Sequence, residues 1–327
     1  MTNTSQPSAR PPIRLTSSDG IIASIPTLVG FTPADSLVII TLAGSRVGLT
    51  LRVDLPPAGE ETAAVAAHAA RTIDRHRLNA QLAAVLVVIG EDVRADLVDA
   101  VTEHLATVGV PVRQSLHTSA IAAGMPWQCL CDCGEVGILD DPATSVLAVT
   151  AAATTGQVSY RSREELAAAL DSRIDTGTAH RRAELIGALD GAGAVVQGAV
   201  LEFGARVLSG RLDQLDENTI VGIGAALLQP TRRDALVSWT AEITEPGVMR
   251  AAWLRMVQQL PGEARAYAAT LCAIAALLDG DGATANVALD VAEELRPGLS
   301  LARLVSQITA RGITPTALRE LIRDGVR

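Results

Sequence analysis

The spacing of apolar and polar positions changes near the middle of the chain. Before residue 172, short apolar runs alternate with stretches of helical periodicity, and beyond residue 183 nearly every periodic stretch is helical. The pattern predicts strands over 37–42, 47–55, 83–89 and 110–117, and helices over 18–28, 60–78 and 92–108. We therefore expect an N-terminal α/β domain with a mixed sheet, followed by an all-α domain.

Two local signals set the limits of these domains. Gly44-Ser45 predicts a hairpin turn before the alternating stretch Val47–Leu55, and the polar residues 1–12 predict a disordered leader. The stretch 172–182 has no periodicity, which makes it the predicted domain boundary. The expected organisation is a leader over 1–12, an α/β domain over 13–172 and a helical domain over 183–327.

The helical domain contains one hairpin with a repeat-like pattern. The turn Gly280-Asp-Gly282 is followed by residues spaced as in the second helix of a tetratricopeptide unit: Ala285, Leu289, Ala292 and Pro297. The chain contains no second copy at that period. The prediction is therefore an irregular helical domain with one tetratricopeptide-like hairpin.

Two further patterns in the helical domain predict packing. Trp239 and Trp253 each lie in an apolar helical pattern, so we expect both to anchor the core. A glycine motif that binds nucleotides follows directly after a strand, and no strand is predicted before Gly222-Ile-Gly224. We interpret these glycines as positions where two helices approach closely.

Composition excludes several function classes. All 27 basic residues among the 327 are arginine, and the absence of lysine excludes P-loop, protein-kinase and Schiff-base chemistry. A net charge of −9 argues against binding of duplex nucleic acid, whose phosphates need a basic surface. Seven aromatic residues leave few platforms for stacking single-stranded bases. No nucleic-acid partner is expected.

The chain also lacks the signals of export and membrane insertion. Its first residues have no apolar segment typical of a secretory signal, and Tyr267–Leu278, its longest uncharged apolar run, is well short of the ~20 residues that span a bilayer. We therefore expect a cytoplasmic protein without a membrane partner, in which the four cysteines are reduced.

Three of these cysteines form the most distinctive chemical cluster. Cys129, Cys131 and Cys133 alternate along a predicted strand over 127–133, so their thiols would share one face. Three thiolates favour a soft metal ion such as zinc, with a fourth ligand from Cys272, His117 or Asp132. However, a straight strand separates Cys129 from Cys133 by about 13 Å, too far for one ion unless the chain bends. The alternative is that these are small buried hydrophobic residues or adventitious thiols.

A second candidate site lies on the predicted hairpin. Arg52 and Asp54 share one strand face, close to Asp35-Ser36 at the end of the neighbouring strand. One hypothesis is an anion-binding arginine that the carboxylates orient within a small-molecule or hydrolytic site. The alternative is a surface ion pair, which contributes about 0–1 kcal/mol.

Several segments together resemble a known family. They are Ile25–Leu37, with its Ile-Pro-x-x-Val-Gly-Phe-x-Pro-x-Asp-Ser-Leu pattern, Leu51–Leu55, Trp127 with the cysteines, Ser162–Leu166, Arg233–Leu236 and Gly280–Ala302. In these the chain resembles the actinobacterial family called domain of unknown function 4192. The resemblance implies a cytoplasmic protein and carries no catalytic residues. The family has a longer cysteine loop, whereas here 129–137 is compressed and only Glu135-x-Gly137 matches.

Three function hypotheses follow. No H-E-x-x-H, G-x-S-x-G or dinucleotide-binding motif is present, so a non-catalytic interaction or scaffold protein with a protein partner and no cofactor is favoured. The second hypothesis is a cysteine-based metal or redox sensor with zinc as its metal. The third is the small-molecule or hydrolytic α/β domain using Arg52, Asp54, Asp35 and Ser36.

Overall fold

The computed structural model describes residues 17–44, 46–57, 59–76, 81–131, 133–155, 159–245, 247–311 and 313–325. The predicted leader over 1–12 lies outside these residues. The chain forms two compact units: the first comprises residues up to Leu28 together with Pro33–Ala153, and the second comprises Val29–Thr32 together with the residues from Thr154 onward. The boundary expected at 172–182 is further along the chain than this division, and the independent folding of the two parts stays a prediction.

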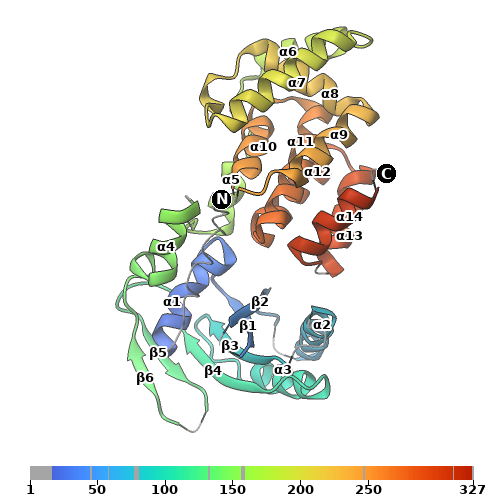
Figure 1. Cartoon of the computed structure of the whole chain (residues 1–327). Helices are drawn as coiled ribbons and strands as arrows, with labels where there is room; N and C mark the ends of the chain where they lie inside the picture. Colours follow the sequence, from blue (N-terminus) through green and yellow to red (C-terminus); the bar gives the residue numbers. More distant parts are fainter. Residues whose placement is uncertain are drawn as a thin grey trace, which may run out of the picture. The chain divides into compact units, whose positions relative to one another are not determined.

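The first unit is built on a mixed sheet, as the sequence pattern predicted (Figure 1). The sheet has six strands, and the short last strand, Val136–Ile138, was not predicted. The strand order is β2-β1-β3-β4-β5-β6; β3 and β4 are parallel, and all other neighbours are antiparallel. The strands are β1 Ser36–Ala43, β2 Arg46–Asp54, β3 Ala83–Ile89, β4 Val112–Thr118, β5 Pro126–Cys129 and β6 Val136–Ile138.

Helices cover both faces of this sheet (Figure 1). The amphipathic helices α2 and α3 bury their apolar sides against Leu37, Ile39, Leu86 and Val88, which alternate to one face. Helix α1 lies on the opposite face. Every residue of β3 is buried because this strand is covered on both sides, which explains its continuous apolar sequence. The helices are α1 Ser18–Val29, α2 Glu60–His76 and α3 Ala95–Thr107.

One helix near the end of the first unit differs from the prediction. The short 3-10 turn η1 (Pro142–Thr144) is followed by α4 (Val146–Thr155), which the sequence pattern did not indicate. Its residues are alanine, valine, leucine and threonine on all sides, so there is no alternation between an apolar and a polar face to recognise.

The second unit is helical beyond Tyr160. Helix α6 begins at Thr176, where the Asp175 carboxylate accepts a hydrogen bond from Thr178 N, so part of the predicted boundary segment is helix. The elements are α5 Arg163–Ala169, α6 Thr176–Ala188, α7 Gly193–Leu208, η2 Leu212–Gln214, α8 Glu217–Leu228, α9 Pro230–Glu242, α10 Val248–Gln259, α11 Gly262–Asp279, α12 Gly282–Leu295, α13 Ser300–Arg311 and α14 Pro315–Gly325.

Aromatic side chains lie at the centre of this unit. Trp253 is fully buried, as predicted, and its Nε1 donates a hydrogen bond to Thr240 Oγ1 at 2.9 Å. Phe203 packs between the two indoles, with ring centroids 5.5 Å from Trp253 and 6.0 Å from Trp239. Trp239 is partly buried against the same core. Both indoles therefore anchor the core.

The two glycines of Gly222-Ile-Gly224 lie where helices touch, as expected. A methyl group on Gly222 would approach the Cβ of Ala199 to 2.2 Å, and one on Gly224 would approach Ile186 Cδ1 to 2.5 Å. A methyl group does not fit at Gly222, and at Gly224 it fits only if the neighbouring Ile186 side chain moves, so these glycines permit close helix packing.

A short segment from early in the chain completes the second unit. Phe31 forms a parallel bridge with Tyr160: Thr32 N donates to Tyr160 O, and Tyr160 N donates to Gly30 O, both at 2.9 Å. Phe31 is buried in the core of the helices. The described residues contain no helix that is both long and apolar enough to cross a bilayer.

The predicted hairpin around Gly280 is present as α11 and α12. Gly280 adopts a left-handed conformation with φ 80°, which ends α11, and the Asp281 carboxylate caps α12 by accepting from Thr284 N. The tetratricopeptide-like character of this hairpin stays a prediction.

Candidate functional site

The three clustered cysteines lie in the connection between the last two strands of the sheet. The strand predicted over 127–133 ends at Cys129, and the chain turns back to begin β6 at Val136. Cys129 N donates to Glu135 O at 2.8 Å, and Leu130 N donates to Ser115 O at 2.7 Å. The predicted strand over 127–133 was therefore too long, because the chain leaves the strand after Cys129 and turns back toward β6.

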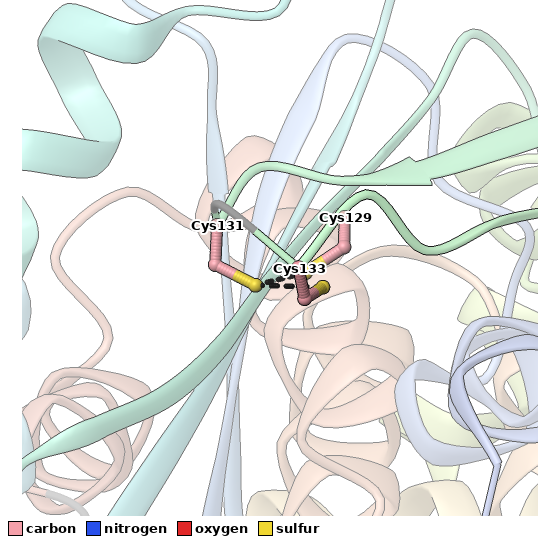
Figure 2. A group of neighbouring side chains, drawn as sticks. All are labelled: Cys129, Cys131 and Cys133. Atoms are coloured by element: carbon pink, nitrogen blue, oxygen red, sulfur yellow. Dashed lines mark hydrogen bonds between the residues drawn. The ribbon is translucent and has the colours of Figure 1, made fainter.

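This bend brings the three sulfurs together. Cys131 Sγ lies 2.8 Å from Cys129 Sγ and 2.9 Å from Cys133 Sγ (Figure 2). All three sulfurs lie within 4.8 Å of one another. The separation of about 13 Å between Cys129 and Cys133, which argued against a shared ion, applies only to an extended chain.

Burial and hydrogen bonding make the three thiols chemically unequal. Cys129 is 8% exposed, and burial is the main cause that raises the pKa of its thiol to about 11; hydrogen bonding with Cys131 adds to it. Cys131 is exposed, and its pKa is lowered, mainly by its hydrogen bonds with the Cys129 and Cys133 thiols. The Cys131 thiol therefore ionises more readily than the buried Cys129 thiol.

Glu135 attaches the loop to the first helix. Its carboxylate accepts a hydrogen bond from Ser18 Oγ, at the start of α1, at 3.1 Å and from Gln114 Nε2, on β4, at 3.2 Å. Gln114 Nε2 also donates to Ser18 Oγ at 2.8 Å. The sequence pattern missed the roles of Ser18 and Gln114, because residues so far apart in the chain give no local signal. The match of Glu135-x-Gly137 to the family pattern was the only indication in the sequence that Glu135 has a role.

The structure restricts the fourth ligands that were proposed. Cys272 is fully buried in the core of the second unit, where its thiol faces Arg250 O. His117 pairs with Gln128 in the sheet, so its ring lies on the face opposite Cys129, with Nε2 3.0 Å from Gly90 O. Asp132 lies outside the described residues. Within the part of the chain that is described, no other His, Cys, Asp or Glu donor joins the three thiols.

The second candidate site is also assembled, at the other edge of the sheet. Arg52 Nη2 lies 2.5 Å from Asp54 Oδ1, and Arg52 Nε donates to Ser36 Oγ at 2.9 Å. Asp35 is exposed next to them in a left-handed conformation with φ 41°. Because the Arg52 guanidinium bonds to protein groups, the arrangement resembles the surface ion pair of the alternative interpretation, and its role in ligand binding stays a prediction.

The two candidate sites do not share a cleft. Their strands are separated by β1, β3 and β4 in the sheet order. Successive register partners connect Arg52 to Cys129 across one row: Val38, Val87 and Leu116. Four strand spacings correspond to about 19 Å. The cysteine loop and the arginine cluster are therefore independent features.

Comparison with known proteins places the whole arrangement in one family. A family model described as Domain of unknown function (DUF4192) matches residues 19–316 of the 327. The chain belongs to this family. No curated protein and no solved structure gives a significant match. The DUF4192 match includes the cysteine loop and most of both units. Because the family has no described function, function has to be argued from the side chains described above.

Proposed function

We propose that the protein is a cysteine-based sensor in which Cys129, Cys131 and Cys133 bind a soft metal ion, with zinc as the candidate. The observation that carries the proposal is the convergence of three sulfurs within 4.8 Å on a loop anchored at both ends. Thiolates are the ligands that zinc and other soft ions prefer.

The distances are compatible with a zinc–thiolate site. Zinc binds thiolate sulfur at about 2.3 Å, which places two sulfurs of a tetrahedral site about 3.8 Å apart. The contacts at 2.8 and 2.9 Å would therefore open by about 1 Å on binding. Rotation of the exposed Cys131 and Cys133 side chains provides this movement without changing the strand pairing of Cys129.

A site of this kind suits sensing better than permanent structural support. Structural zinc sites are closed by four protein ligands, whereas three thiols leave one position to solvent or to an added ligand. Two of the sulfurs are exposed, so the ion can exchange with the solution. Binding also releases protons, because the Cys129 thiol is protonated at neutral pH.

Metal content of the purified, reduced chain tests this function. We expect about one zinc per chain after dialysis against limiting zinc, and thiolate-to-metal charge-transfer bands after cobalt substitution. Cys131→Ser should abolish both signals. Cys272→Ala is the matched control, because it removes a buried thiol outside the loop and should leave the stoichiometry unchanged. Equal metal content in Cys131→Ser and the natural chain would refute the proposal.

A second candidate function, protein interaction, has its own supporting observation. Helices α12 and α13 and the turn between them border an open depression of about 550 Å³ lined by Leu289, Asp290, Glu293, Gly298, Arg303, Ser306 and Gln307. A groove between helices is a common docking place for a segment of a partner protein. A photo-crosslinker at Gln307 of the full chain should trap such a partner, whereas one at the exposed Leu208 of α7 should not. The same crosslinked products from both positions would contradict a specific interaction at this site.

A further inference from the structure

We infer that the cysteine loop is a peroxide-reactive switch, in which a hydroperoxide oxidises Cys131, and Cys133 then forms a disulfide with it and releases the bound metal. The metal-release part rests on the proposed function. The oxidation itself depends only on the arrangement of the three thiols.

Accessibility and position single out Cys131 as the sulfur that the peroxide oxidises first. It is exposed, and it is the sulfur in contact with both of the others, at 2.8 and 2.9 Å. Redox-sensing cysteines are accessible to the oxidant and have a second thiol within reach. By contrast, Cys129 is largely buried, and Cys272 is fully buried in the second unit. These two thiols are shielded from a peroxide in solution.

The backbone distinguishes between the two thiols that could resolve the oxidised form. Cys129 ends β5, pairs with Leu116, and its N–H donates to Glu135 O. Cys133 lies in the connection between β5 and β6, directly before Gly134, which has φ 69°. A disulfide requires specific Cα and Cβ geometry. Cys133 can adjust toward this geometry within the turn, whereas a shift of Cys129 would disturb the sheet.

The chemistry balances with a hydroperoxide as the two-electron oxidant. The Cys131 sulfur attacks one peroxide oxygen and breaks the O–O bond; the other oxygen leaves with a proton as water when the oxidant is hydrogen peroxide. Cys131 is then a sulfenic acid. The Cys133 sulfur attacks the Cys131 sulfur and displaces its hydroxyl group, which leaves with a second proton as water. Two sulfurs have lost two electrons in total, and two of the three metal ligands are consumed.

Mapping of the oxidised thiols tests the inference apart from metal binding. The metal-free chain is treated with one equivalent of hydrogen peroxide, alkylated and digested. We expect a Cys131–Cys133 disulfide. In Cys133→Ser, a sulfenic acid at Cys131 should accumulate and be trapped by dimedone. Cys131→Ser should lower the rate of peroxide consumption more than tenfold, whereas Cys272→Ala should leave it unchanged. A Cys129–Cys131 disulfide, or crosslinks only between chains, would overturn the assignment.

The metal-loaded chain then tests the coupling. With a chromophoric zinc chelator present, one equivalent of peroxide should release the bound zinc, and a thiol reductant should restore binding. Disulfide formation without loss of zinc would overturn the switch while leaving the metal site intact. If the chain binds no metal, the proposed function fails, and the peptide mapping still decides whether Cys131 and Cys133 react.

Discussion

The glycine at position 222 provides a direct test of the packing between α7 and α8. Replacing it by alanine should raise the helix propensity of α8 by roughly 1 kcal/mol. Yet the added methyl carbon would lie 2.2 Å from the Cβ of Ala199, whereas carbon atoms in contact are about 3.5–4.0 Å apart. Both atoms are fixed to their backbones, so no side-chain rotation relieves the clash. We therefore expect Gly222→Ala to destabilise the second unit.

The size of the effect follows from the separation that the clash requires. The helices must move apart by roughly 1.3–1.8 Å, which loosens the contacts of Phe203 and Ile220 in the same core. Overpacking of this kind costs about 1–3 kcal/mol, and we place this case at the upper end, because neither methyl can turn away. After the propensity gain is subtracted, the expected loss is about 2 kcal/mol of unfolding free energy.

Urea denaturation monitored by tryptophan fluorescence measures this loss, since Trp239 and Trp253 lie in the second unit. With a typical slope of about 2 kcal/mol per molar urea, the midpoint should fall by about 1 M. Adding Ala199→Gly moves the methyl to the other helix and should restore most of the stability. Gly198→Ala is the matched control: Gly198 is an exposed residue of α7, and an added methyl there would have no atom within 4 Å, so this change should be neutral or stabilising. A neutral Gly222→Ala would refute the packing argument.

Three further predictions concern other contacts. Thr240→Val leaves the buried Trp253 Nε1 without its acceptor and should cost about 1–3 kcal/mol in urea unfolding, whereas Thr240→Ser should keep the bond; equal stabilities would contradict this. Hydrogen bonding from Arg94 lowers the pKa of Asp96 from 3.8 to about 2. The ionised Asp96 carboxylate therefore stabilises the fold fully above pH 4, and this stabilisation is lost as the pH falls toward 2. Asp96→Asn should therefore lower the melting temperature at pH 7 more than at pH 2, and a pH-independent difference would disprove the link. Circular dichroism should show that fragment 159–327 is helical and has a higher melting temperature than fragment 183–327, which is cut inside α6. The reverse order of melting temperatures would contradict the assignment of residues 159–182 to the second unit.

The regular elements could be predicted because their patterns are local. Strand β3 matches its predicted range, since a run of seven apolar residues bounded by turns is typical of a strand covered on both faces. Helix α4 was missed because its polar and apolar residues are not segregated. The start of α6 was missed although Asp175 is an N-cap residue of the preferred type, because the helix after it has little periodicity.

The candidate site could be predicted only in its residue types. The sequence identifies Cys129, Cys131 and Cys133 as a group, but the distance between their sulfurs depends on a bond from Cys129 N to Glu135 O, which periodicity does not encode. Gly134 has a left-handed conformation in this turn, and glycine is the residue type that such a position favours. The attachment of Glu135 to Ser18 and Gln114 joins three distant segments, and such pairings follow from the tertiary fold alone.

The bridge between Phe31 and Tyr160 has a consequence for how the protein is made. The segment Val29–Thr32 is synthesised early, yet its partners in the second unit follow about 130 residues later. At ribosomal rates of about 5–20 residues per second, Phe31 waits roughly 6–26 seconds before Tyr160 exists. Throughout that interval Tyr160, which bridges to Phe31, is absent from the nascent chain. The segment 29–32 can therefore take its place in the second unit only after the residues of the whole first unit have been synthesised.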